Sequence, residues 1–150
     1  MTSAKHLPED AFPYLSLAER DRLLAHGREE RFAAGETILR ERHQSRAVYV
    51  LAKGRVSVEK DHLGLGVVVD ELRPGAVFGE VSYLDGSPTS ASIVAREDVD
   101  VVVLEELDEL LASDPALASG FYRSLATLLA RRLRFTTEDS VTAATALIWG

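Results

Sequence analysis

The apolar residues of this chain follow a helical period near both ends and a strand period between them. Residues 16–19, with the sequence SLAE, have the form of a capping box and predict a helix over residues 17–26 that Gly27 ends. In residues 30–104, short β-branched runs alternate with Gly, Pro and Asp. This pattern predicts an antiparallel β-roll, so the expected fold class is mainly β with flanking helices.

Several strands can be placed within the central region. Residues 48–58 are predicted to form a hairpin, and residues 62–66 to form the loop of another. The valine runs at 67–69 and 101–103 are continuous, which predicts burial on both faces. Further strands are predicted at residues 35–38, 93–95 and 99–104.

Two helices are predicted after the last strand. The first covers residues 105–111, where three leucines share one face. The second begins at Asp114 and Pro115, which have the residue types preferred at the N-cap and the first helical position. It carries an apolar stripe that is wider than a small roll needs for its own core, formed by Phe121, Leu125, Leu128, Leu129 and Leu133.

The end of the chain, residues 135–150, is predicted to be a helical extension. Val141, Ala144 and Ile148 lie at helical spacing, which favours one long helix. The polar residues at 136–140 would equally serve to cap a separate helix. Both alternatives stay open at this point.

Composition narrows the class of protein. With 150 residues, 46% of them hydrophobic and 27% charged, the chain is expected to form one domain with its own core. It has no cysteine, no apolar leader and no apolar run of membrane-spanning length, so a soluble, cytoplasmic protein is expected. A net charge of −7 argues against nucleic-acid binding, which needs a basic surface.

One motif carries most of the functional information. Residues 78–92, which we call the cassette, contain Phe-Gly-Glu at 78–80 and Gly-Ser-Pro at 86–88. They resemble the phosphate-binding cassette of cyclic-nucleotide-binding domains of the catabolite-activator and protein-kinase-A regulatory-subunit type. The resemblance implies a single domain over residues 1–150, with a core of about residues 15–134, a short cassette helix, one N-terminal helix and two C-terminal helices.

The resemblance also implies a ligand site. Gly79 would let backbone amides approach an anion, and Glu80 would bind a ribose hydroxyl, although a plain helix-capping role for Glu80 is an equal alternative. Hydroxyls and amides after Pro88 would donate to a cyclic phosphate. The implied ligand-binding residues are Phe78, Gly79, Glu80, Val81, Ser82, Thr89, Ser90, Ala91 and Ser92.

The cassette departs from the family at one position, because Thr89 stands where the family has an arginine. A bidentate arginine contributes two charge-assisted hydrogen bonds to a phosphate, each worth roughly 1.5–3 kcal/mol. Its absence should weaken cyclic-nucleotide binding on the order of a hundredfold. Alternatively, Thr89 only begins the next strand in a domain that has lost its ligand.

The C-terminal helix has two implied roles in this family, as a lid over the pocket or as a dimer contact, and the stripe from Phe121 to Leu133 would serve either. Trp149 could stack on a base, but is more simply a packing residue. The DNA-binding domain of the family's transcription regulators would follow this helix, and about sixteen residues remain after Arg134. DNA binding is therefore not expected.

Three functions follow from these observations. The first is a stand-alone sensor whose roll binds a cyclic nucleotide or another nucleotide messenger and acts through the C-terminal helix. The second is a ligand-free domain that forms homodimers or docks a protein partner. The third, an enzyme on a cupin-like roll, lacks the His-x-His pair of such metal sites, so no cofactor, metal or catalytic residue is predicted.

Overall fold

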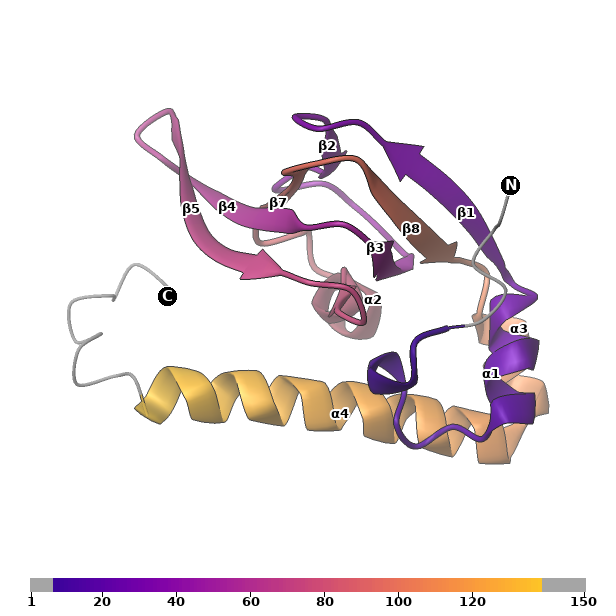
Figure 1. Cartoon of the computed structure of the whole chain (residues 1–150). Helices are drawn as coiled ribbons and strands as arrows, with labels where there is room; N and C mark the ends of the chain where they lie inside the picture. The colour runs from indigo at the N-terminus through magenta and orange to yellow at the C-terminus, as the bar shows by residue number, and fades with distance from the viewer. Residues whose placement is uncertain (1–6, 139–150) are drawn as a thin grey trace.

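The computed structural model describes residues 7–138, and Figure 1 shows a β-roll lying over a layer of helices. This is the fold class that the sequence predicts, including the short cassette helix. In chain order the elements are η1 (Glu9–Ala11), α1 (Leu17–Leu24), β1 (Gly27–Phe32), β2 (Thr37–Leu39), β3 (Val48–Lys53), β4 (Val56–His62), β5 (Leu65–Leu72), β6 (Val77–Phe78), α2 (Glu80–Asp85), β7 (Ser92–Ala95), β8 (Val99–Leu104), α3 (Asp108–Ser113) and α4 (Pro115–Glu138).

The roll consists of two antiparallel sheets of four strands each. Their strand orders are β1-β8-β3-β6 and β2-β7-β4-β5. Helix α4 runs as a long rod along one side of the roll, and α2 lies between them (Figure 1). The cassette helix is therefore in a position to contact both the sheets and α4.

Strand β8 separates the two halves of the core because its side chains alternate. Val101 and Val103 pack inside the roll, whereas Val102 and Leu104 pack toward the helices. All of them are buried, so the predicted burial of residues 101–103 on both faces is confirmed.

The helix-side core begins earlier in the chain than the predicted boundary near residue 15. Leu7 and Phe12 are buried in the same cluster as Leu23 and Phe121. The rings of Phe12 and Phe121 stack with their centroids 5.4 Å apart. The segment before α1 is thus part of the domain core.

The predicted hairpin over residues 48–58 is wrong. Strand β3 pairs with β6 and β8, whereas β4 pairs with β5 and β7, so the chain passes from one sheet to the other near Gly54. Gly54 has a φ of 90°, and a Cβ there would lie 2.6 Å from the carbonyl oxygen of Asp98. The alternating valines did not reveal the crossover. Side chains alternate with a period of two in every strand, so the pattern does not show whether two consecutive strands pair with each other or lie in different sheets.

The predicted burial of residues 67–69 is also wrong. The loop predicted at residues 62–66 does close a hairpin, with Leu63 and Gly64 between β4 and β5. This hairpin extends beyond the rest of the roll (Figure 1), and β5 is an edge strand. Val67 and Val68 are consequently 42% and 48% exposed.

The capping signals at both predicted helix starts are confirmed. The Ser16 hydroxyl accepts a hydrogen bond from the Glu19 N–H, and the Glu19 carboxylate accepts one from the Ser16 N–H. At the start of α4, the Asp114 carboxylate accepts from the Leu117 N–H at 3.1 Å. These side chains satisfy amides that the helices leave without intrahelical partners.

Two helix boundaries differ from the prediction. Helix α1 ends at Leu24 instead of residue 26, and α3 begins at Asp108 instead of residue 105. Before α3, Glu106 has a φ of 55°, which interrupts a helical path. The predictions for residues 139–150, including Trp149, lie outside the described residues.

Part of the predicted lid or dimer stripe belongs to the domain's own core. Phe121 and Leu125 are fully buried, and Leu128 packs against the same cluster. Leu129 is half-buried, while Leu133 is 69% exposed. The helix needs an apolar face to pack on the roll, so Phe121 and Leu125 are not available to a partner.

The first half of α4 is also tied to the segment before α1. The Tyr14 N–H donates a hydrogen bond to the buried Ser124 hydroxyl at 3.1 Å, and the Arg123 guanidinium lies 4.1 Å from the centroid of the Tyr14 ring. No helix within residues 7–138 combines the length and apolar character that a bilayer crossing requires.

The crossover at Gly54 can be tested against a matched glycine. Gly35 has the same φ of 90°, but a Cβ there would have no neighbour within 4 Å. We expect Gly35→Ala to cost about 1 kcal/mol through backbone strain alone and Gly54→Ala to cost roughly 2–4 kcal/mol. Urea unfolding measures both values. Equal losses would contradict the close approach at Gly54.

Candidate functional site

A cavity of about 360 Å³ lies between the cassette, the β4–β5 hairpin and α4. Its wall combines apolar residues of both hairpin strands with polar residues of the cassette. The lining residues are Leu39, Val58, Lys60, Val69, Asp70, Leu72, Phe78, Gly79, Glu80, Val81, Ser82, Thr89, Ser90, Ala91, Ile93 and Arg132.

The structure brings most of the predicted ligand-binding residues to this cavity. The exception is Ser92, whose hydroxyl instead accepts a hydrogen bond from the Glu41 N–H at 2.9 Å. The cassette is thus not an extended surface segment. Predicted residues that line the cavity are Phe78, Gly79, Glu80, Val81, Ser82, Thr89, Ser90 and Ala91.

The cassette begins with a tight turn at Gly79. This residue is the N-cap of α2 and has a φ of 79°. A Cβ at Gly79 would lie 2.9 Å from Cδ1 of Tyr49, whose ring stacks on Phe78 with centroids 5.1 Å apart. Glycine is therefore required both for the backbone conformation and for the close approach of the tyrosine ring.

Glu80, the predicted ribose ligand, is sealed from solvent and paired with an arginine. Its side chain is 2% exposed, and its carboxylate accepts a hydrogen bond from the Arg132 guanidinium. The same guanidinium donates to the Val77 carbonyl at 2.7 Å. Burial raises the pKa of Glu80, while the charge and hydrogen bonds of Arg132 act in the opposite direction.

Sequence reasoning did not assign Arg132 to the site, although a signal for it existed. Eleven residues separate Arg132 from Phe121, and eleven residues turn an α-helix by about 20° beyond three full turns. Arg132 therefore continues the buried stripe of Phe121, Leu125 and Leu128. An arginine at a core-facing position of α4 indicates a buried acceptor on the roll.

Thr89 does not face the cavity as a free donor. Its side chain is buried, and its hydroxyl donates to the Arg40 carbonyl and accepts from the His43 N–H at 2.9 Å. Its own N–H donates to the His43 carbonyl at 2.9 Å, and its carbonyl accepts from the Arg42 N–H at 2.8 Å. In this structure these groups hold the β2–β3 loop, and the expectation that Thr89 donates to a phosphate stays a prediction.

The remaining polar groups near the cassette are few. Ser90 is exposed and lines the cavity, and its side chain has no hydrogen-bond partner within residues 7–138. Among the lining residues the cations are Lys60 and Arg132, and the carboxylates are Asp70 and Glu80. The charge of this site is therefore provided largely from outside the cassette.

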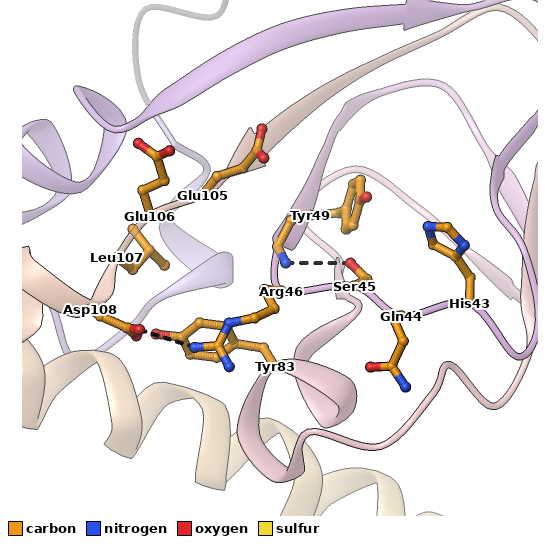
Figure 2. Close-up of a pocket in the computed structure, with 11 residues that line it drawn as sticks. His43, Gln44, Ser45, Arg46, Tyr49, Tyr83, Glu105, Glu106, Leu107 and Asp108 are labelled. Atoms are coloured by element: carbon orange, nitrogen blue, oxygen red, sulfur yellow. Dashed lines mark hydrogen bonds and ion pairs between the residues drawn. The ribbon is translucent and has the colours of Figure 1, made fainter.

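A second cavity of about 470 Å³ lies between the β2–β3 loop, α2 and the start of α3 (Figure 2). Tyr49 lines this cavity and Phe78 lines the first one, so their stacked rings form a shared wall. Arg46 and Asp108 form an ion pair of 3.0 Å across it, but both side chains are more than 70% exposed. Such an exposed pair contributes little stability.

Tyr83 connects the cassette helix to α4 beside this second cavity. Its ring meets Phe121 edge-on with centroids 6.1 Å apart. Burial, together with the neighbouring Tyr122 and Asp108, raises the pKa of the Tyr83 hydroxyl. The Tyr83 ring thus joins α2 directly to a buried residue of α4.

Within the described part of the chain, no group of three or more His, Asp or Glu side chains is placed to hold a metal ion. Three of the histidines, His26, His43 and His62, lie on separate elements or loops, and His6 is outside the described residues.

Comparison with known proteins establishes the family. The family model of the cyclic nucleotide-binding domain matches residues 29–114 of this chain, which run from within β1 to just after α3 and include the whole cassette. The chain belongs to the cyclic nucleotide-binding domain family.

Characterised relatives are longer than this chain. The cyclic AMP receptor protein of Thermus thermophilus is 36% identical over 126 residues, which cover 82% of this chain and 56% of that protein. A cAMP-dependent protein kinase regulatory subunit of Aspergillus niger is 38% identical over 74 residues, covering 49% of this chain and 18% of that protein. The chain thus spans little more than half of the receptor, and much less of the kinase subunit.

Solved structures show the same fold. A cyclic nucleotide-binding domain from Methylobacillus flagellatus superposes with a TM-score of 0.80 at 27% identity, covering 89% of this chain and 82% of that one. The catabolite activator protein of Thermus thermophilus gives a TM-score of 0.74 at 33% identity, covering 90% of this chain and 63% of that one.

The structural role of Thr89 predicts how its substitution affects stability. Thr89→Val keeps the shape but removes the hydroxyl that joins Arg40 and His43. We expect it to lower the free energy of unfolding by about 1–3 kcal/mol, because two backbone groups lose a partner. Thr89→Ser, which keeps the hydroxyl, is the matched control in thermal or urea unfolding. A valine variant as stable as the serine variant would contradict this role.

Proposed function

We propose that this chain is a regulatory domain that binds a cyclic nucleotide in the 360 Å³ cavity and transmits binding to α4. The observation that carries the proposal is the direct contact between the predicted ribose ligand and α4, in which Arg132 holds Glu80. A ligand that takes a bond to Glu80 acts on α4 without an intermediate.

The dimensions and chemistry of the cavity support a small ligand of this kind. Its volume falls within the range of about 300–1,000 Å³ that is common for small-molecule sites. Leu39, Val58 and Ile93 provide apolar wall area suitable for a base. Glu80 offers a carboxylate to ribose hydroxyls, and Ser90 offers a hydroxyl and a backbone amide near the phosphate end.

The expected affinity is low relative to domains that have an arginine in the cassette. Thr89 brings no positive charge, and its hydrogen bonds are used within the protein. Two relatives, the Thermus thermophilus cyclic AMP receptor and the Aspergillus niger cAMP-dependent kinase subunit, are named for cyclic AMP, which makes that nucleotide the first ligand to test.

Calorimetric titration tests the proposal directly. We expect saturable heat with cyclic AMP, cyclic GMP or a cyclic dinucleotide, and a rise in melting temperature with the same ligand. Ser90→Phe should abolish both signals, because it fills the cavity at an exposed residue whose side chain has no hydrogen-bond partner in the described structure. Ser87→Phe, in the same loop but outside the lining, should bind like the parent.

Absence of heat at millimolar concentrations of all these nucleotides would contradict the sensor function. The same is true of binding that Ser90→Phe leaves intact, since the ligand would then occupy another site.

A second function, a ligand-free dimerisation module, is favoured by one observation. Leu133 on α4 is 69% exposed, and Leu129 beside it is half-buried, so the far end of the helix keeps an apolar surface. Phe121 and Leu125 do not contribute, because they are buried in the core. The candidate dimer contact is thus shorter than the stripe that the sequence suggested.

Sedimentation velocity distinguishes this second function. It requires a parent dimer in nucleotide-free buffer that Leu133→Glu converts to monomer, since a charge would be buried in the contact. Leu17→Glu is the matched control, because Leu17 is 73% exposed on α1, away from α4's far end. A parent that stays monomeric at micromolar concentrations would exclude the dimerisation function.

A further inference from the structure

We propose that Arg132 of α4 provides the cation that binds the phosphate of a nucleotide in this cavity, in place of the arginine that Thr89 has replaced. This inference rests on the proposed nucleotide-binding function and assigns the phosphate contact within it. The phosphate-binding role would then have moved from the cassette position of Thr89 to Arg132 on α4, the helix that responds to the ligand.

The first argument is the charge of the cavity lining. An anionic phosphate brought next to Asp70 and Glu80 needs a compensating positive charge. Thr89 has none, and its donors are bonded to the β2–β3 loop. Ser90 is neutral, so the cation must come from outside the cassette.

The second argument is position, which favours Arg132 over Lys60. Arg132 extends from α4 to the first residues of the cassette, where its guanidinium bonds to Glu80 and to the Val77 carbonyl. Lys60 lies on β4 opposite Val67, toward the projecting part of the hairpin. The guanidinium also has the forked geometry that matches two phosphate oxygens, whereas a lysine ammonium does not.

The third argument is that the ligand itself replaces the hydrogen bond that Glu80 loses when Arg132 turns away. A ribose hydroxyl can donate to the Glu80 carboxylate when the guanidinium turns toward the phosphate. The exchange replaces a carboxylate–guanidinium bond with a hydroxyl–carboxylate bond and a guanidinium–phosphate bond. Glu80 keeps a hydrogen-bond donor throughout, which a carboxylate that is 2% exposed requires.

The exchange has a consequence for α4. Its first half is fixed by the buried Phe121 and Leu125 and by the bond between Tyr14 and Ser124. Arg132 lies two turns beyond Leu125, so its guanidinium moves with the second half of the helix. The charge of the ligand, not only its shape, would determine where that half lies.

A comparison of an anionic and a neutral ligand tests this assignment on the full chain. Cyclic AMP and adenosine are titrated into the parent protein and into Arg132→Gln, Arg132→Lys and Arg134→Gln. Arg134 is exposed on the same helix and does not line the cavity, so its variant controls for the loss of one charge.

For Arg132→Gln we expect cyclic AMP binding weaker on the order of tenfold to a hundredfold, with adenosine binding changed by less than about threefold. Arg132→Lys should fall between the parent and Arg132→Gln, because it keeps the charge and loses the fork. Arg134→Gln should match the parent.

Several results would overturn the assignment. Cyclic AMP binding that is equal or tighter in Arg132→Gln would mean that Arg132 only competes with the ligand for Glu80. An equal loss for cyclic AMP and adenosine would mean that Arg132 acts through the shape of the pocket. If Arg132→Gln does not fold, Arg132→Lys decides, and unchanged cyclic AMP affinity in that variant rejects the forked contact.

Failure of the proposed function gives a different result. A parent protein that binds neither cyclic AMP nor adenosine rejects the proposed function before any variant is compared, and the phosphate assignment is then rejected as well.

Discussion

A carboxylate buried inside a β-roll requires a positive partner, and in this domain the partner comes from a different structural layer. Glu80 begins the cassette helix between the sheets and α4, and Arg132 reaches it from α4. The Arg132 side chain is 39% exposed but Glu80 is buried, so removal of Arg132 would leave an uncompensated buried carboxylate, and that costs far more than an exposed ion pair contributes. The same contact between Arg132 and Glu80 therefore fixes the second half of α4 against the cassette and compensates the charge of the cassette carboxylate.

Thr89, which stands where the resemblance implies an arginine, has a structural role in the β2–β3 loop. The buried Thr89 pairs with four backbone groups of the loop, one each on Arg40 and Arg42 and two on His43, and holds the end of the β2–β3 loop against the cassette. The same loop reaches the second cavity, where Arg46 meets Asp108 (Figure 2). The hydroxyl and the N–H of Thr89 both donate within the protein, and this supports our proposal that α4 provides the positive charge of the pocket.

Much of the fold was accessible from local sequence patterns because the responsible interactions are local. The capping residues Ser16 and Asp114 act on amides within three positions, and the alternating valines of β8 report burial on two faces. The predictions that were wrong concern partners far apart in the chain. Residues 48–58 cross between sheets, and Val67 and Val68 stay exposed on an overhanging edge, which no local period indicates.

The sequence by itself determined the family, the β-roll and the eight cassette residues that line the cavity, because the cassette is a continuous segment whose glycines and proline favour its conformation. Only the tertiary structure decided which hydrogen-bond and ion-pair partners those residues have. Thr89 and His43 are forty-six positions apart, and Glu80 and Arg132 are fifty-two apart. Pairings over such distances depend on how the sheets and α4 pack, since hydrogen bonds and ion pairs act over a few ångströms in space regardless of distance along the chain.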